Sequence, residues 1–352
     1  MLNDRIEAKW IKAFARVFEL CGASSDQPVA LVSETQSREL NVHLAELALL
    51  NLGTQPFFLK LPTPPQTVPV PVRSTGASLV LANQTNLLRL LKDTPLIVDC
   101  TLEGLLHAQE LPEILSGGAR VMMVSNEHPD ALERCMPQPG LEEKVRMGVK
   151  KARQCSLMTV TSEAGTDLRI DLNDTPALGN WGFTTKPGTV AHWPGGIVVS
   201  FPRKNTVNGV LVMDSGDINL TFKRYLEKPV ILKIENDYVI SIEGEGTDAE
   251  LFRRYFAAWS DPEAYAVSHV GWGMNPGARY ESLTMYDQRD TNGTELRAFA
   301  GNFLYSTGAN EFAGRYTQGH FDLPLKGCTI RLDDEVIILK GELQGELQGE
   351  LA

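Results

Sequence analysis

The chain changes texture near residue 150, and this change limits its possible folds more than its length or composition does. Up to that point short apolar runs alternate with amphipathic stretches of helical length, whereas beyond it short β-type runs follow one another between Gly, Asn and Pro turns. The first pattern is typical of a doubly wound sheet with helices on both faces, and the second is typical of a mixed sheet with few helices. A length of 352 residues agrees with two cores in one chain.

We therefore predict an α/β protein with two packed domains and a short tail. Residues 1–150 form an N-terminal doubly wound α/β domain, residues 151–340 form a C-terminal α+β domain with a mixed sheet, and residues 341–352 form the tail. The tail is a near-repeat of Gly-Glu-Leu-Gln that is too short for a repeat fold. We expect it to be frayed, and the alternative is a strap that packs on a neighbouring subunit.

Hydrophobic periodicity and turn residues place the individual elements. In the first domain they predict strands at 28–32, 56–60, 95–98 and 120–124, and helices at 4–20 and 37–50. A helix near 142–153 leads into the second part, where they predict strands at 157–160, 168–172, 196–200, 209–213, 230–234 and 239–242, and one helix near 249–259. Five prolines within residues 62–71 predict an extended loop.

The excess of acidic residues excludes several partners. Forty-four Asp and Glu against 33 Lys and Arg give a formal net charge of −11, which repels nucleic-acid phosphates and anionic membranes. No run of eighteen apolar residues occurs, and charged residues stand where a signal peptide would need an apolar segment, so we expect a cytoplasmic protein with no membrane partner. The five cysteines are scattered without a CxxC spacing, which predicts reduced thiols.

Several common catalytic motifs are absent from the sequence. It has no Gly-x-x-x-x-Gly-Lys-Ser/Thr phosphate loop, no Gly-x-Ser-x-Gly elbow and no His-Glu-x-x-His zinc motif. The glycine-rich segment 271–277 lacks the third glycine of a dinucleotide loop and holds a proline where the helix should begin. The six histidines are therefore the most informative residues for function.

Three of the histidines are interpreted as structural residues. His43 lies inside a predicted helix, at the edge of the core or in solvent. His128 precedes Pro-Asp at the start of a predicted helix, where proline and an acidic residue are typical of the first turn. His192 stands beside a tryptophan and is interpreted as part of a packed pair.

Two further histidines lie where they could hold a metal. The segment His320-Phe321-Asp322 alternates like a strand, so His320 and Asp322 share one face about 7 Å apart along the backbone. His269, followed by a glycine-rich turn, is the candidate third ligand. Two imidazoles and one carboxylate with open positions bind Fe(II), and the same set with water binds zinc in hydrolases. From spacing alone, iron, zinc and three unrelated histidines all stay open.

At these residues the second domain resembles the thermophilic-type leucyl aminopeptidases. Their two-metal site uses a Pro-x-Gly-Glu-Val glutamate, a Glu-Leu-Gly-Ile-Gly-Thr-Asn-Pro glutamate and a terminal His-x-Asp, and the matching stretches here are Trp-Pro-Gly-Gly-Ile-Val at 193–198, His-Val-Gly-Trp-Gly-Met-Asn-Pro at 269–276 and His-Phe-Asp at 320–322. Ile197 and His269 replace the two glutamates, so the carboxylates that bridge two hydrolytic metals are missing. The resemblance implies an aminopeptidase-like fold with ligands left for one metal.

The altered pattern also resembles the 2,5-dihydroxypyridine 5,6-dioxygenase family over most of the chain. This resemblance implies Fe(II) as the cofactor, with His269, His320 and Asp322 as its ligands. It implies a hydroxypyridine and O2 as reactants, ring opening between C5 and C6, and N-formylmaleamic acid as the product. Both resembled families assemble from several subunits, so a homo-oligomer is expected.

The same resemblance extends to the first domain. The segment Thr-Leu-Glu-Gly-Leu-Leu-His at 101–107 is similar to the family's active-site segment, which makes Leu106 a substrate contact and His107 the acid/base at the 5-hydroxyl. Ser306 is our candidate for a hydroxyl that contacts the ring, and a turn-forming serine is the alternative.

Two other functions compete with ring cleavage. The first is a divergent zinc or cobalt aminopeptidase of the same fold, against which Ile197 argues because it cannot ligate a metal. The second is a non-catalytic binding protein in which the histidines are core groups. Bound iron with O2 consumption would indicate ring cleavage, and bound zinc with peptide turnover would indicate an aminopeptidase. Failure to bind any metal would indicate a binding protein.

Overall fold

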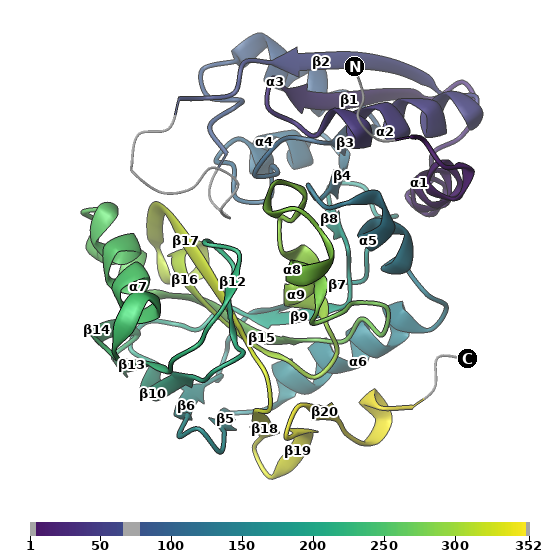
Figure 1. The fold of residues 1–352 in the computed structure, drawn as a ribbon. Helices are drawn as coiled ribbons and strands as arrows, with labels where there is room; N and C mark the ends of the chain where they lie inside the picture. The colour runs from purple at the N-terminus through teal and green to yellow at the C-terminus, as the bar shows by residue number, and fades with distance from the viewer. Residues whose placement is uncertain (1–4, 66–77, 350–352) are drawn as a thin grey trace.

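Five parallel strands form the sheet of the N-terminal lobe in a computed structural model that describes residues 5–65 and 78–349 (Figure 1). In spatial order they are β2 (Gln55–Leu61), β1 (Pro28–Glu34), β3 (Leu96–Asp99), β4 (Arg120–Val124) and β8 (Val190–Trp193). The last strand comes from beyond residue 150 and pairs in parallel with β4, so the chain returns to this sheet after starting the second lobe.

Helices cover both faces of the parallel sheet. Along β1, Val29 and Leu31 pack with one set of helices, and Ala30 and Val32 pack with the other, because successive side chains point to opposite faces. The first set is α1 (Ala8–Leu20), α2 (Glu39–Asn51) and α5 (Pro129–Arg134), and the second is α3 (Thr85–Lys92) and α4 (Leu111–Ser116). The predicted doubly wound α/β layer is confirmed.

The C-terminal lobe is built on two larger antiparallel sheets (Figure 1). The first has the order β17 (Arg315–Leu325), β16 (Phe303–Asn310), β15 (Val267–Gly273), β9 (Ile197–Ser200) and β7 (Ala177–Asn180). The second has the order β14 (Tyr238–Glu243), β13 (Val230–Glu235), β10 (Val207–Met213), β6 (Asp167–Asp171), β5 (Leu157–Thr161), β18 (Thr329–Leu332), β19 (Glu335–Leu339) and β20 (Glu342–Leu343).

Helices and short segments complete this lobe. The helix α6 (Leu141–Gln154) packs on β7 and β9, and α7 (Gly246–Ala258) packs on β14. The remaining elements are β11 (Ile218–Asn219), β12 (Arg224–Tyr225), α8 (Ser282–Met285), α9 (Thr294–Ala298) and the 3-10 turns Pro262–Tyr265, Gln288–Asp290, Glu311–Ala313 and Gly345–Leu347.

The core of the C-terminal lobe fixes which face of β17 meets the site. Phe321 is fully buried and its ring lies 4.4 Å from that of Tyr255 and 5.1 Å from that of Phe252, both on α7. Since side chains alternate along a strand, anchoring Phe321 in this aromatic cluster turns His320 and Asp322 to the opposite face.

The C-terminal tail is ordered where the structure describes it, so the prediction of a frayed tail is wrong there. Leu343 pairs with Ile338 of β19, and Leu347 is fully buried in the core of the lobe. The buried leucine explains the difference, since a Gly-Glu-Leu-Gln repeat supplies one apolar anchor in every four residues. The predicted proline-rich loop at 62–71 lies in part outside the described residues, which resume at residue 78.

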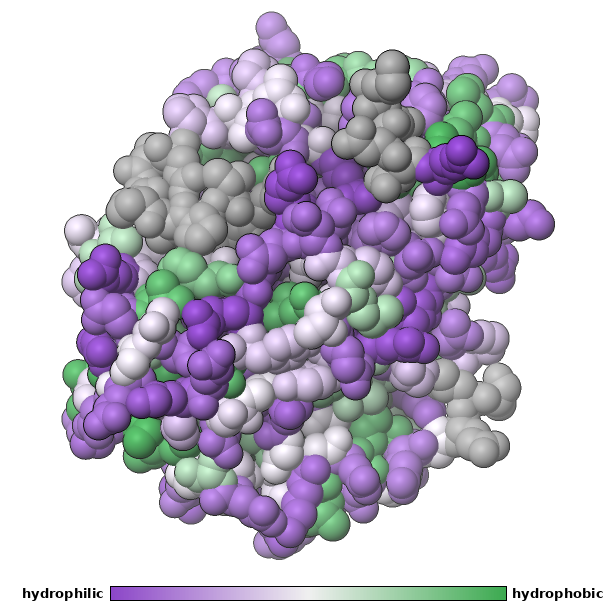
Figure 2. Space-filling view, viewed as in Figure 1, coloured by the Kyte–Doolittle hydropathy of each residue, from purple (hydrophilic) through white to green (hydrophobic). Residues whose placement is uncertain are grey.

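The molecular surface in the view of Figure 2 is mostly hydrophilic, with apolar patches that are small and separated. Among the described residues, no helix is long and apolar enough to cross a membrane.

Candidate active site

A cavity of about 1160 Å³ lies between the two lobes, next to the carboxyl ends of the parallel strands. In doubly wound sheets this edge is the usual place for ligands, because loops and helix ends converge there. The N-terminal lobe contributes Leu106 and His107 from the loop after β3, and His192 from β8. The C-terminal lobe contributes the polar residues His269, Arg297, His320 and Asp322.

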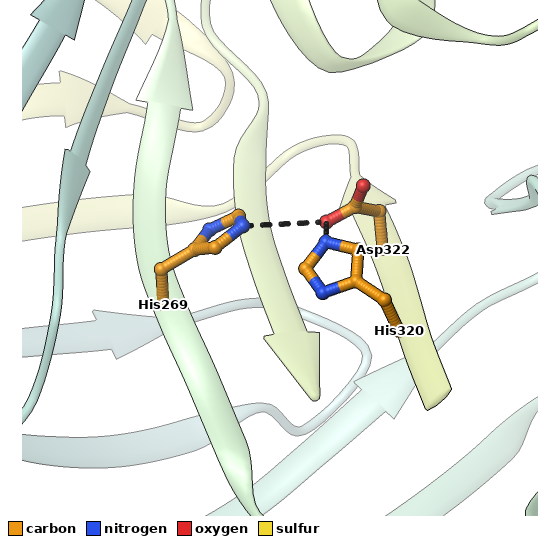
Figure 3. A group of neighbouring side chains, drawn as sticks. All are labelled: His269, His320 and Asp322. Atoms are coloured by element: carbon orange, nitrogen blue, oxygen red, sulfur yellow. Dashed lines mark ion pairs between the residues drawn. The ribbon is translucent and has the colours of Figure 1, made fainter. Parts of the chain in front are cut away.

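Three of the predicted site residues meet at one wall of this cavity (Figure 3). His269 on β15 faces His320 and Asp322 on β17, and one ligand atom from each lies within 4.8 Å of the others. The Nε2 atom of His269 is 3.7 Å and that of His320 is 3.2 Å from Oδ1 of Asp322. All three side chains are buried, so the two imidazoles and the carboxylate form a preorganised donor set.

The Asp322 carboxylate is oriented by two further side chains. Ser306, its register partner on β16, donates to Oδ1, and Nε of Arg297 donates to Oδ2. Burial alone would raise the pKa of Asp322, but its interactions with His320 and Arg297 outweigh burial and hold the pKa well below its usual range. The carboxylate is therefore ionised, with Oδ1 directed toward both imidazoles.

Ser306, the predicted ring contact, does not reach the surface of the cavity in the structure. Ser306 has no exposed surface, does not line the cavity and lies behind Asp322, to which it donates its hydroxyl hydrogen. The physical reason is its position on β16, directly opposite Asp322 on the neighbouring strand β17. Its hydroxyl stabilises a neighbouring carboxylate instead.

Burial lowers the pKa of two of the imidazoles at the site, those of His269 and His107. It lowers the pKa of His269 to about 3, and within the described residues the buried Nδ1 atom of this ring has no hydrogen-bond partner. The pKa of His107 also lies well below its ordinary value, first because of burial and then because of the neighbouring rings of His320 and His269. Neutral imidazoles can act as ligands or proton acceptors at neutral pH.

The loop after β3 brings His107 to the donor set. Oδ2 of the buried Asp99 accepts from the backbone N–H of Leu105 at 2.7 Å, and Oε1 of Glu34 accepts from that of Leu102 at 2.7 Å. These bonds fix the loop so that the His107 ring lies 4.6 Å, centroid to centroid, from the His320 ring. The predicted segment of the first domain therefore meets the predicted ligands of the second.

The sequence interpretation of His192 missed its place at the site. His192 lines the cavity, and its Nδ1 lies 2.8 Å from the carbonyl oxygen of Pro194. Because a carbonyl oxygen can only accept, Nδ1 carries the hydrogen and Nε2 is left as an acceptor. Burial lowers the pKa of His192 to about 4, so the ring is neutral.

Arg297 is another cavity residue that was not predicted from the sequence. It lies on the five-residue helix α9, in a segment that has no periodic pattern long enough to predict an element. The other two of the three histidines interpreted as structural, His128 and His43, do not line the cavity. His128 accepts a hydrogen bond from the backbone N–H of Asp130 at the start of α5, and His43 lies 3.4 Å from Glu46 on the surface of α2.

The donor set suits one metal. Among the described residues, His269, His320 and Asp322 are the one group of His, Cys, Asp and Glu side chains close enough to hold an ion. Ile197, which stands where the aminopeptidase pattern has a glutamate, lies on β9 and lines the cavity as an apolar residue. No bridging carboxylate for a second metal is contributed from that position.

The chain is similar to known proteins over nearly its whole length. The family model of 2,5-dihydroxypyridine 5,6-dioxygenase matches residues 9–345. A protein of that name from Pseudomonas putida KT2440 is 33% identical over 340 residues, which cover 96% of each chain.

Solved structures extend the comparison to the fold. The structure of 2,5-dihydroxypyridine dioxygenase from Pseudomonas putida KT2440 superposes with a TM-score of 0.91 at 32% identity, covering 98% of this chain and 100% of that one. Wild-type AmpT from Thermus thermophilus matches with a TM-score of 0.63 at 14% identity, covering 95% of this chain and 98% of that one, which shows a shared fold alone. The family match over residues 9–345 and the 33% identity over 96% of the chain, together with one donor set among the described residues, show that the chain belongs to the 2,5-dihydroxypyridine 5,6-dioxygenase family.

Proposed function

We propose that this protein uses Fe(II), held by His269, His320 and Asp322, to open the ring of 2,5-dihydroxypyridine between C5 and C6 with O2. The product is N-formylmaleamic acid, and both atoms of O2 enter it, so no external reductant is needed. The observation that carries the proposal is the buried two-histidine, one-carboxylate set at the wall of a cavity in a chain of this family.

The geometry of the donor set fits a single octahedral ion. Ligand atoms at about 2.1 Å from a metal and at right angles to one another lie about 3 Å apart. The separations of 3.2 and 3.7 Å from Asp322 Oδ1 to the Nε2 atoms of His320 and His269 exceed that spacing by about 0.2 and 0.7 Å, and the three ligand atoms lie within 4.8 Å of one another. Two imidazoles and one carboxylate on one face are the ligands typical of non-haem Fe(II) oxygenases.

The bound metal would supply open positions at which the pyridine diol and O2 are brought together and activated. His107 is the residue that takes the proton of the substrate's 5-hydroxyl, because its ring lies beside that of His320 and its depressed pKa keeps it neutral. Leu106, next to it, gives the ring an apolar contact. Arg297 keeps Asp322 ionised and adds a positive charge at the cavity wall.

Anaerobic reconstitution tests this function directly. The apoprotein is loaded with one equivalent of Fe(II) or Zn(II), and O2 uptake and loss of the substrate's ultraviolet absorbance are followed after addition of 2,5-dihydroxypyridine. We expect one O2 consumed per substrate with Fe(II) and none with Zn(II). Bound iron without O2 uptake would contradict the assigned substrate.

The hydrolase alternative is not favoured. A two-metal aminopeptidase needs bridging carboxylates, and the described residues offer one donor group and an isoleucine at the glutamate position. The similarity to AmpT is one of fold. The Zn(II) sample of the same experiment, assayed with an aminoacyl chromogenic substrate, tests this alternative, and peptide turnover would support it.

A further inference from the structure

Glu127 is a buried carboxylate that reaches from one lobe into the other. It lies in the loop between β4 and α5 of the N-terminal lobe, and its side chain is 1% exposed. Its carboxylate accepts from the backbone N–H groups of Asn292, Gly293 and Thr294 at 3.1, 2.7 and 2.7 Å. The three donors belong to the segment that starts α9 in the C-terminal lobe.

The chemistry of this contact is that of a helix cap supplied from a distant part of the chain. The first N–H groups of a helix have no partner within it, and a negative charge there is stabilised by these groups and by the helix dipole. The backbone N–H groups of Asn292 and Gly293, which precede α9, also donate to the Glu127 carboxylate. One carboxylate therefore fixes the backbone conformation of the residues that lead into α9. The backbone of Glu127 is itself fixed, because Nδ2 of Asn41 donates to its carbonyl oxygen at 2.9 Å.

The segment that Glu127 holds continues directly to the candidate metal site. Oδ1 of Asn292 accepts from Nη1 of Arg297 at 3.1 Å and from Oγ1 of Thr294 at 2.9 Å. The same guanidinium donates through Nε to Oδ2 of Asp322. Asn292, Thr294 and Arg297 all line the cavity, so the capped segment forms one of its polar walls.

The far end of α9 is fixed within the C-terminal lobe. Nδ2 of Asn302 donates to the carbonyl oxygens of Leu296 and Arg297 at 3.1 and 2.9 Å. Because α9 spans five residues, its own hydrogen bonds cannot hold it rigid, and both of its ends need outside partners. The N-terminal lobe supplies one of these partners, and that partner is Glu127.

We propose that Glu127 is a positioning residue of the metal site, acting through the Asn292–Arg297 segment on Asp322. Docking of the N-terminal lobe thereby aligns the guanidinium that holds the metal-binding carboxylate, in addition to bringing His107 to the site. The proposal deepens the proposed function and rests on it for the identity of the metal.

The test compares Glu127→Gln with a matched control. Gln keeps the shape but loses the charge and replaces one acceptor by an N–H group that faces backbone donors. Asp237→Asn is the control, because Asp237 is equally buried and accepts from the backbone N–H groups of Asn205, Thr206 and Val207 but has no contact with the donor set. For each variant we measure folding by thermal denaturation, the Kd for Co(II), the Co(II) absorption spectrum, and kcat and KM with Fe(II).

We expect Glu127→Gln to weaken Co(II) binding or lower kcat by about 10- to 100-fold, the range seen when groups that orient a metal ligand are removed. The Co(II) spectrum should change, since the carboxylate ligand is no longer held in one orientation. Asp237→Asn should lower the melting temperature while its Co(II) affinity, spectrum and kcat stay within about twofold of the unmutated protein. Equal effects in the two variants, or none in Glu127→Gln, would overturn the proposal.

A double-mutant cycle identifies the route of the effect. If Glu127 acts through Arg297, then Glu127→Gln should cost little further Co(II) affinity in an Arg297→Met background, whereas full additivity would contradict that route. Should Glu127→Gln fold poorly, Glu127→Asp supplies the same measurement, because it keeps the charge but withdraws the carboxylate by one methylene. Absence of Fe(II)-dependent O2 uptake in the unmutated protein would refute the proposed function, whereas normal Co(II) affinity, spectrum and kcat in Glu127→Gln would refute only this inference.

Discussion

The two oxygens of Asp322 have different partners, and this asymmetry organises the site. Oδ1 faces both imidazoles and accepts from Ser306, whereas Oδ2 is held by Arg297. A carboxylate held in this way presents one oxygen to an ion and keeps its charge, because His320 and the guanidinium of Arg297 hold its pKa low against the effect of burial. Arg297 in turn needs the negative charge of Asp322, because its side chain is only 7% exposed and water cannot solvate the guanidinium well.

Replacing His320 or Asp322 by alanine should therefore change the stability of the protein by different amounts. His320→Ala should lose stoichiometric Fe(II) binding with little change in stability, because an open metal site is functional rather than structural. Asp322→Ala should also lose Fe(II) and in addition cost about 3–5 kcal/mol, because it leaves a buried guanidinium unpaired. Metal analysis and urea denaturation check this, and equal stability of the two variants would contradict the pairing.

Replacing the assigned base should separate binding from catalysis. His107→Ala should keep Fe(II), since His107 is not in the donor set, and lose about 10²- to 10⁴-fold in kcat. His43→Ala, a change on the surface of α2, is the control. Normal turnover by His107→Ala at every pH would show that the base is another residue.

The low pKa of His192 predicts loss of stability in acid. Its folded-state pKa of about 4 lies below the unfolded value near 6.5, so the unfolded chain binds more protons between these values and stability falls as the pH drops through that window. The melting temperature of the apoprotein should decline between pH 6.5 and 4. In His192→Gln the decline should be smaller, and an unchanged decline would mean that His192 is not its source.

At the scale of elements, the alternation of side chains along β17 could be predicted from the sequence. The positions of His269 and Arg297, which meet β17 at the site, could not. Period-two patterning correctly placed His320 and Asp322 on one face because Phe321 is an obvious core residue. The position of His269 depends on a register shift between Val267 and Val270 in the pairing of β15 with β16, for which no local pattern exists. Arg297 was missed because the short helix α9 is held by tertiary contacts rather than by its own propensity.

The C-terminal strand and turn offer a test of element-scale packing. Leu347→Ala should destabilise the protein by about 2–5 kcal/mol, because the leucine is fully buried in the core of the C-terminal lobe. Leu339→Ala, at a position that is 46% exposed, should change the free energy of unfolding by far less. Urea unfolding curves measure both, and equal effects would mean that the tail is not anchored by Leu347.

At the scale of the whole molecule, the two lobes together make the site. The N-terminal lobe supplies His107 and Glu127, and the C-terminal lobe supplies the donor set, so neither lobe alone carries the proposed chemistry. The two-lobed fold class could be predicted from the change in texture near residue 150, but the return of β8 to the parallel sheet could not, since parallel pairing is set by long-range contacts. The domain boundaries, the cytoplasmic location and the homo-oligomer stay predictions.

The most direct test of the central claim is the fate of the two oxygen atoms of O2. The Fe(II)-loaded protein is mixed with 2,5-dihydroxypyridine under ¹⁸O₂, and the product is analysed at once by mass spectrometry, with His320→Ala as the control. We predict N-formylmaleamic acid with two labelled oxygens, one in the carboxyl group and one in the formyl group, and no product from the variant. A product in which the pyridine ring is still intact, or one that carries a single ¹⁸O atom, would contradict ring-cleaving dioxygenation at this site.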